Sequence, residues 1–233
     1  MSRTAALLAG GLATRLGGLA KDTPKAMLEV GGRPFIDWQL EQVAAQGIQE
    51  AVLCLGHLAQ AIEGHVQDGE RFGLKVRYSY DGPKALGTGG ALKQALPLLG
   101  ASFFVLYADS WLQAPWTAMR QAYAHGDCDS VMSVLRNQGQ WDKSNVKFAD
   151  GWVKAYDKRA PGADFDCIDY GLNLFSAASF GFLEKDAFDL GELQGLLAAK
   201  GRLRGVEATE RFYEIGTPEG LEQTRAYLTR SKP

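Results

Sequence analysis

The sequence predicts a three-layer α/β/α sandwich with a mostly parallel, mixed central sheet and a small β-hairpin lobe. In the first 135 residues, short uninterrupted apolar runs alternate with longer segments of helical spacing. This alternation is typical of parallel strands that helices cover on both faces. After residue 136 the runs become shorter, and Asp150-Gly151 between two of them is a strong hairpin signal. We expect one domain over residues 1–233, with halves at about 1–135 and 136–233.

In order, the first half contains apolar or alternating runs that predict strands and segments of helical spacing that predict helices. The expected strands are Thr4–Ala9, Met27–Val30, Ala51–Leu55, Lys75–Tyr80, Ser102–Tyr107 and Ser130–Leu135. The expected helices are residues 34–46, 58–67, 87–98 and 115–125. Glycines or prolines separate most of these segments, as expected at element boundaries.

The second half begins with the hairpin of Val146–Ala149 and Trp152–Tyr156. Further strands are expected at Ile168–Phe175 and Phe212–Ile215, and helical segments at 177–183, 193–200 and from Pro218 to about Arg230. We expect the five tryptophans to be packing residues.

Composition excludes several functional classes. At 233 residues and 46% hydrophobic content the chain can bury a sizeable core. A net charge of −2 argues against a nucleic-acid or membrane partner. No apolar run is long enough to span a bilayer, so we expect a cytoplasmic protein. The three widely separated cysteines predict reduced core residues rather than disulfides or a zinc site.

The loop after the first strand is the first candidate site. Gly10 and Gly11 let backbone N–H groups approach a ligand closely, and Arg15 and Lys25 follow with positive charge. Amides and cations together favour phosphate oxygens. The spacing matches neither a Walker loop nor a dinucleotide-binding loop. A tight turn after an edge strand is the alternative interpretation of the glycines.

Other segments add polar residues that would lie beyond strand ends. Asp109 follows an apolar strand, so it should face a crevice, meet a cation or cap the next turn. Thr88 stands at a helix start and could cap that helix. Glu214 alone could be a surface residue, and Asp157-Lys158-Arg159 could be a solvated charge cluster.

Taken together, these segments resemble the sugar-1-phosphate nucleotidylyltransferases over nearly the whole chain. The resemblance is carried by residues 7–16 with Pro24-Lys25, by Leu86–Leu92, by Leu106–Asp109 and by Arg211–Pro218. The chain departs from the family pattern at Ala13, Ala108, Asp157, Asp169 and Glu214. The short length and the run Gly31–Leu40 look most like the bacterial heptose-1-phosphate guanylyltransferases and their uridylyltransferase relatives.

The resemblance implies roles for individual residues. Arg15 would hold the β and γ phosphates, and Lys25 would stabilise charge at the α-phosphate. The expected nucleotide-binding residues are Leu8, Ala9, Gly10, Gly11, Ala13, Thr14, Gly87, Thr88 and Asp109. Asp109 and Glu214 would hold Mg²⁺, and the expected sugar-phosphate-binding residues are Asp157, Lys158, Asp169, Gly171 and Asn173. On this basis the first half would bind the nucleotide and the second the sugar phosphate.

The resemblance therefore predicts a Mg²⁺-dependent enzyme that makes a nucleotide sugar and pyrophosphate from GTP and a heptose 1-phosphate. A uridylyltransferase acting on a sugar such as N-acetylmuramate 1-phosphate is one alternative. A nucleotide-sugar-binding regulatory protein without turnover is another. The expected partners are an NTP and a sugar 1-phosphate, with no nucleic acid and no membrane. The oligomeric state stays open between a monomer and a homodimer.

Overall fold

The computed structural model describes residues 2–11, 16 and 23–230, and the expectations for Ala13, Thr14 and Arg15 lie outside this part of the chain. Within it, a nine-stranded sheet runs in the order β5-β4-β1-β6-β11-β8-β12-β10-β9. Its strands are β1 Thr4–Leu8, β4 Glu50–Leu55, β5 Lys75–Tyr80, β6 Ser102–Tyr107, β8 Ser130–Arg136, β9 Val146–Ala149, β10 Trp152–Tyr156, β11 Cys167–Ser176 and β12 Leu203–Ala208. Two short ladders pair β2 Glu29–Val30 with β3 Arg33–Pro34, and β7 Ser110–Trp111 with β13 Tyr213–Glu214.

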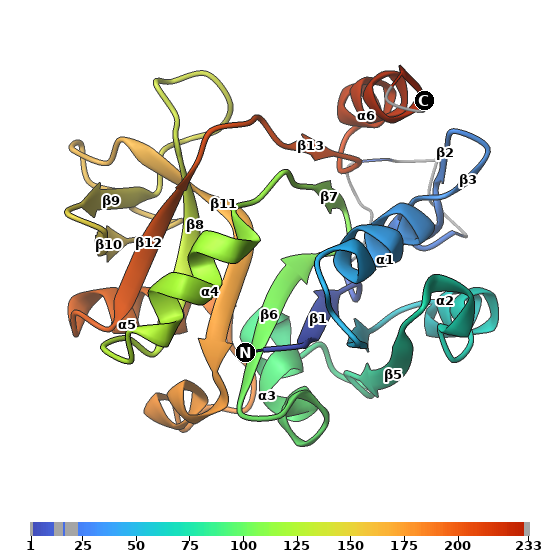
Figure 1. Ribbon diagram of the computed structural model, residues 1–233, viewed down its shortest axis with the longest axis horizontal. Coiled ribbons are helices and arrows are strands. Elements are labelled where there is room, and N and C mark those ends of the chain that lie inside the picture. The colour runs from blue at the N-terminus through green and yellow to red at the C-terminus, as the bar shows by residue number, and fades with distance from the viewer. Residues whose placement is uncertain (1, 12–15, 17–22, 231–233) are drawn as a thin grey trace.

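Helices cover both faces of the sheet, which confirms the three-layer prediction (Figure 1). The α-helices are α1 Phe35–Ala45, α2 Ala59–Val66, α3 Gly87–Leu99, α4 Trp116–Ala124, α5 Leu190–Ala199 and α6 Pro218–Arg230. Side chains of α1, α2 and α4 fill the core on one face, and those of α3 and α5 fill the core on the other. Burial on both faces explains why β1, β4 and β6 are apolar without alternation.

Parallel and antiparallel pairs divide the sheet. β1 pairs in parallel with both β4 and β6, and β4 pairs in parallel with β5. β11 runs antiparallel to β6 and β8 and so connects the two halves of the chain in one sheet. The hairpin β9–β10 turns at Asp150 and Gly151, whose φ angles of 54° and 75° are those of a type I′ turn. The hairpin lobe is therefore continuous with the sheet.

Three local predictions need correction, and one strand was missed. Lys25–Met27 forms a 3-10 turn (η2), so the strand predicted from Met27 is only Glu29–Val30. Residues 177–182 form a 3-10 helix (η4) rather than an α-helix. β12 was not predicted, because Gly205 and Glu207 weaken its apolar pattern. Thr88 lies inside α3 and does not cap it, as described below.

α6 packs on a separate small core formed with the β2–β3 hairpin and the start of α1. The largest side chains of this core are Phe35 and Trp38. Trp111 of β7 packs edge-on against Trp38, with ring centroids 6.2 Å apart. This core fixes the C-terminal helix beside the segment that follows β6. No helix among the described residues is long and apolar enough to cross a bilayer.

Candidate active site

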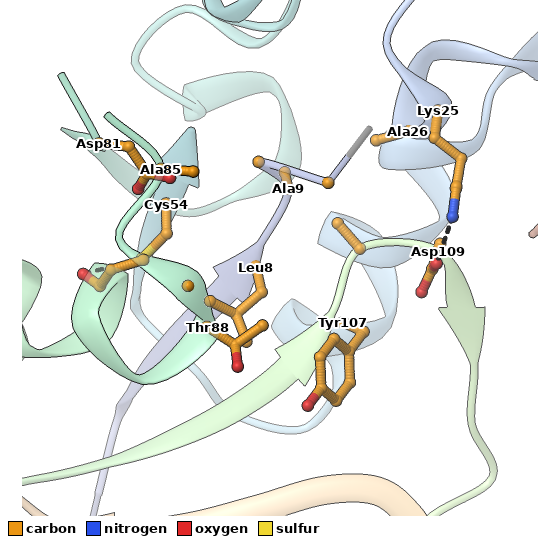
Figure 2. Close-up of a pocket in the computed structure, with 15 residues that line it drawn as sticks. Leu8, Ala9, Lys25, Ala26, Cys54, Asp81, Ala85, Thr88, Tyr107 and Asp109 are labelled. Atoms are coloured by element: carbon orange, nitrogen blue, oxygen red, sulfur yellow. Dashed lines mark hydrogen bonds and ion pairs between the residues drawn. The ribbon is translucent and has the colours of Figure 1, made fainter. Parts of the chain in front are cut away.

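A cavity of about 330 Å³ opens at the carboxyl end of β1. β1 is flanked by β4 and β6, which the chain reaches through crossovers on opposite faces of the sheet, and ligands of open α/β sheets bind at such positions. The lining residues come from residues 8–11, Lys25-Ala26, Cys54, the stretch 81–91 and residues 107–109. Figure 2 shows Lys25 and Asp109 at one side of the cavity and Asp81 and Ala85 at the opposite side.

Lys25 and Asp109 form an ion pair at the charged side of the cavity. Lys25 Nζ lies 2.9 Å from Asp109 Oδ2, and the two side chains are 14% and 28% exposed. The Ser110 hydroxyl donates to Asp109 Oδ1 at 3.1 Å. The carboxylate thus meets a cation, as one of the expectations for Asp109 required.

Neighbouring elements hold the backbone on which Asp109 lies. The N–H of Ile215 donates to the carbonyl of Asp109 at 2.9 Å, next to the β7–β13 ladder. From α1, the side-chain amide of the fully buried Gln39 donates to the carbonyl of Ser110, and that of Gln42 donates to Leu112 O at 2.6 Å. These bonds fix the backbone from which the Asp109 side chain projects, just beyond the end of β6.

The glycine run at the start of α3 packs against the segment that leads into α5. Gly87 has φ +72°, and a Cβ there would lie 2.6 Å from Phe188 O. The N–H groups of Gly89 and Gly90 both donate to that same oxygen, at 3.0 and 3.2 Å. The Thr88 hydroxyl accepts from the N–H of Leu190 at 2.8 Å, so it supports the start of α5, whose N-cap is Asp189, and does not cap its own helix. Gly87 and Thr88 nevertheless line the cavity.

Asp81 lies at the opposite side of the cavity from Lys25 (Figure 2). Burial raises the pKa of its carboxyl above the ordinary value of 3.8, although a hydrogen bond from the backbone of Leu86 works in the opposite direction. Cys54 lies in the same wall, and burial raises the pKa of its thiol to about 12, so this cysteine stays protonated at neutral pH. Among the described lining residues, the end of the cavity away from Lys25 combines an apolar wall with the carboxylate of Asp81.

Tyr107 connects the cavity with Lys158. Its ring lines the cavity, and Lys158 Nζ lies 3.4 Å from its hydroxyl oxygen and 5.6 Å from its ring centroid. Burial works to lower the pKa of Lys158, but Tyr107, Asp169 and Asp189 together raise it above its usual value. Lys158 is therefore a cation at neutral pH beside the cavity that Tyr107 lines.

Asp169 and Asn173 belong to a polar network on β11. Asp169 Oδ1 accepts from the N–H of Gly171 at 3.0 Å, and Oδ2 accepts from the amide of Gln194 at 3.2 Å. The same Gln194 amide donates to Asn173 Oδ1 at 3.1 Å, and Asn173 is fully buried. Direct contact of Asn173 with a sugar phosphate, which the resemblance implied, does not fit this position.

Glu214 and Asp157 line hollows other than the cavity of Lys25 and Asp109. Glu214 is paired in register with Ser110, so its backbone lies beside Asp109, but its side chain lines a neighbouring hollow of about 440 Å³. Asp157 lines a third hollow together with Lys158, and its carboxylate accepts from the backbone N–H groups of Arg159 and Ala160. Those two bonds hold the pKa of Asp157 below its usual value.

The structure therefore brings together most of the nucleotide-site residues singled out in the sequence. Leu8, Ala9, Gly10, Gly11, Lys25, Gly87, Thr88 and Asp109 all line one cavity. Sequence reasoning missed Asp81 and the contact of Tyr107 with Lys158. Asp81 comes directly after β5, and Asp109 comes two residues after the end of β6, so position at a strand end was the signal that could have identified Asp81.

Comparisons with known proteins concern the chain as a whole. The family model described as Nucleotidyl transferase matches residues 4–141, which is more than half of the chain. The chain belongs to the nucleotidyl transferase family. The D-glycero-alpha-D-manno-heptose 1-phosphate guanylyltransferase of Campylobacter jejuni is 36% identical over 218 residues, covering 92% of this chain and 95% of that protein. The N-acetylmuramate alpha-1-phosphate uridylyltransferase of Caulobacter vibrioides is 31% identical over 240 residues, covering 98% of each.

Solved structures give the same result for the fold. HddC from Yersinia pseudotuberculosis, solved in complex with GMP-PN, superposes with a TM-score of 0.79 at 25% identity, covering 98% of this chain and 100% of that one. A putative glucose-1-phosphate thymidylyltransferase from Bacillus anthracis has a TM-score of 0.85 at 18% identity and shows the fold alone. As a member of the nucleotidyl transferase family with these relatives, the chain is a sugar-1-phosphate nucleotidyltransferase.

Proposed function

We propose that this nucleotidyltransferase transfers GMP from GTP to a heptose 1-phosphate, with Mg²⁺, and releases pyrophosphate. The observation that carries the proposal is the arrangement of charge in the cavity of about 330 Å³. A lysine–aspartate pair lies at one side and a half-buried carboxylate at the other. The Lys25–Asp109 pair suits a triphosphate with its metal, and the Asp81 carboxylate suits a nucleobase.

The reaction joins two anions, because a sugar-phosphate oxygen attacks the α-phosphorus of the nucleotide in line with the leaving pyrophosphate. Positioning and fixed positive charge lower this barrier, and no protein nucleophile is required. Lys25 would stabilise the charge that develops at the α-phosphate. Arg15, outside the described residues, is proposed to hold the β and γ phosphates. Lys158 would neutralise the incoming sugar phosphate, because it keeps its charge beside the cavity.

Asp109 fits the role of a Mg²⁺ ligand. Mg²⁺ prefers hard oxygen donors and is often bound by one or two carboxylates together with substrate phosphates and water. Asp109 offers such a carboxylate at the cavity wall, and the described residues contain no larger cluster of metal-ligating side chains. The ion would neutralise phosphate charge. Glu214 is the proposed second carboxylate for Mg²⁺, because its backbone pairs with Ser110 beside Asp109.

The carboxylate of Asp81 favours guanine as the base. An ionised carboxylate only accepts hydrogen bonds. Guanine presents two adjacent donors, N1–H and the N2 amino group, on one edge. Uracil presents a single N3–H between two carbonyl oxygens, which a carboxylate would repel. Asp81 at the end of the cavity away from Lys25 is therefore a specific reason to prefer GTP over UTP.

The heptose part of the proposal is supported by the relative from Campylobacter jejuni and by the structural likeness to HddC. The alternative is transfer of UMP to N-acetylmuramate 1-phosphate, the activity named for the relative from Caulobacter vibrioides. Both reactions follow the same chemistry, and their products differ in the base and the sugar.

A panel assay tests the proposal. Purified protein is incubated with each of the five common NTPs and with heptose, mannose, glucose or N-acetylmuramate 1-phosphate, with and without Mg²⁺, and pyrophosphate release is measured. We expect the highest kcat/KM with GTP and the heptose 1-phosphate, only when Mg²⁺ is present. Preference for UTP would contradict the role of Asp81. Ligand-induced thermal stabilisation without pyrophosphate release in any combination would indicate a regulatory binding protein.

A further inference from the structure

The hollow beside the β7–β13 ladder has a volume of about 440 Å³, in the range of binding sites for small molecules. Three segments far apart in the sequence line it: residues 140–142 after β8, residues 211–214 that lead into and form β13, and residues 217–223 at the start of α6. Its inner end lies close to Asp109, because Glu214 pairs with Ser110 and the next residue, Ile215, bonds to the carbonyl of Asp109.

Trp141 and Arg211, which line this hollow, belong to a stack of four side chains that continues behind the lining through Tyr213 and Tyr227. The guanidinium of Arg211 lies 4.5 Å from the Trp141 ring centroid and 4.4 Å from that of Tyr213. Tyr213 in turn stacks on Tyr227 of α6, with ring centroids 4.1 Å apart and planes inclined by 17°. Arg211 is held further by a 2.9 Å bond from Nη2 to Gln223 Oε1. Trp141 ends the stack and keeps 41% of its surface exposed, so an aromatic side chain faces solvent at the hollow.

The loop that carries Trp141 is organised from within by Asn137, which is only 1% exposed. Its Oδ1 accepts from the N–H of Trp141 at 3.1 Å, and its Nδ2 donates to Ser144 Oγ at 3.1 Å and to the carbonyl of Asp142. A buried amide that uses three hydrogen bonds to shape one loop fixes the backbone that carries the Trp141 side chain.

Apart from Phe212 and Gly220, the remaining lining is polar and mostly acidic. Asp142 and Glu219 contribute carboxylates on two sides, Glu214 contributes a third, and Gln140 and Gln223 contribute amides. Among the described lining residues, Arg211 is the cation, and its two faces are covered by aromatic rings. Carboxylates accept hydrogen bonds from hydroxyl groups, amides donate and accept, and an aromatic ring packs against the C–H face of a sugar.

We propose that this hollow binds the sugar ring of the acceptor and selects an uncharged, hydroxyl-rich sugar over one that bears a carboxylate. The inference rests on the proposed function, because it places the sugar of the sugar 1-phosphate beside Asp109. Trp141 packs on the ring, and Asp142 and Glu219 accept from its hydroxyl groups. A heptose suits this lining. N-acetylmuramate carries a lactyl carboxylate, which Asp142 and Glu219 repel.

The first test removes the aromatic ring of Trp141. Trp141→Ala should raise the KM for the heptose 1-phosphate about tenfold and leave the KM for GTP and the kcat at saturating sugar close to wild type. Trp141→Phe should keep most of the affinity. Trp152→Ala is the matched control, because Trp152 also stacks on an arginine, Arg204 at 4.5 Å, but lies in β10 away from the hollow. An unchanged KM for the sugar in Trp141→Ala would overturn the inference.

The second test changes the charge of the hollow. Glu219→Lys should lower the ratio of kcat/KM for the heptose 1-phosphate to that for N-acetylmuramate 1-phosphate by about tenfold, because it replaces a repulsive charge with an attractive one. Glu222→Lys is the control, since Glu222 lies on the same helix, pairs with Arg225 at 2.6 Å and is not part of the lining. An equal ratio in wild type and Glu219→Lys would overturn the inference.

Calorimetry separates failure of this inference from failure of the proposed function. If no substrate pair gives pyrophosphate release, the proposed function is contradicted. The hollow would still be tested by titrating the heptose 1-phosphate into wild type and Trp141→Ala without nucleotide. Binding that weakens about tenfold in the variant supports the hollow as a sugar site, and equal binding contradicts it.

Discussion

Lys25 and Asp109, 84 positions apart in the sequence, meet as an ion pair of 2.9 Å at one side of the cavity at the end of β1. Lys25, the proposed phosphate-binding cation, and Asp109, the proposed metal-binding carboxylate, thus neutralise each other. If Mg²⁺ and the triphosphate bind as proposed, each replaces one partner of this pair. The ion pair therefore keeps both charges at the cavity wall and leaves neither one unpaired in a partly buried site.

Lys25→Ala should lower kcat by about 100-fold, because it removes a charge directed at the transition state. Lys25→Arg should recover part of the rate, since it keeps the charge but changes its geometry. The measurement is steady-state pyrophosphate release. Lys147→Ala is the control, because Lys147 forms an exposed ion pair with Asp164 in the hairpin lobe and should leave the rate unchanged. A near-normal rate for Lys25→Ala would remove Lys25 from the mechanism.

Asp109→Asn should separate metal binding from nucleotide binding. Loss of the carboxylate weakens Mg²⁺, so the Mg²⁺ concentration for half-maximal rate should rise about tenfold or more. Without Mg²⁺, GTP should bind the variant at least as tightly as it binds wild type, because Lys25 loses its competing partner and a negative charge is removed. Calorimetry of GTP with and without Mg²⁺ measures both effects. A variant with the wild-type Mg²⁺ dependence would disprove the assignment of Asp109.

Asp81 gives a prediction on pH and stability. Its raised pKa means that the folded protein binds this proton more tightly than the unfolded chain, so its contribution to stability falls as pH rises from the ordinary value of 3.8 through the raised value. Asp81→Asn removes this penalty and should have a higher Tm than wild type at neutral pH, with a smaller difference in acid. Calorimetric scans across this pH range measure it. A variant with a lower Tm at neutral pH would show that the carboxylate is stabilising.

The same variant tests the base. Asparagine presents an amide donor beside an acceptor, so Asp81→Asn should lower kcat/KM for GTP about tenfold and narrow the preference for GTP over UTP. An unchanged ratio between the two nucleotides would show that Asp81 does not contact the base.

A pair of glycine substitutions tests the packing of α3 against the segment before α5. In Gly90→Ala the new Cβ would lie 2.4 Å from the backbone carbonyl oxygen of Asp186, which cannot move aside without shifting the chain. We expect a loss of about 1–3 kcal/mol in the free energy of unfolding. Gly64→Ala in α2, where nothing lies within 4 Å, should instead gain about 0.5–1 kcal/mol. Denaturant titration measures both, and equal effects would contradict the packing account.

The fold was largely predictable because its strands and helices have clear periodicity and its chain order alternates. The cavity was predictable where a residue lies just beyond a strand end, as Asp109 does, or belongs to the early glycine loop. What could not be predicted depends on partners distant in sequence. The amides of Gly89 and Gly90 are bonded to Phe188, about 100 positions away, and no local pattern indicates that contact. Asn173 of β11 likewise lies in a buried network whose partner Gln194 comes from α5.

The central claim is that the chain transfers a nucleoside monophosphate, and isotope tracing tests it most directly. GTP labelled at the α-phosphate or at the γ-phosphate is incubated with Mg²⁺ and the heptose 1-phosphate, and the products are separated. The account predicts that the α label enters the nucleotide sugar and that the γ label leaves in pyrophosphate, with Lys25→Ala reducing both. Appearance of the γ label in inorganic phosphate or on the sugar, with no labelled nucleotide sugar, would contradict it.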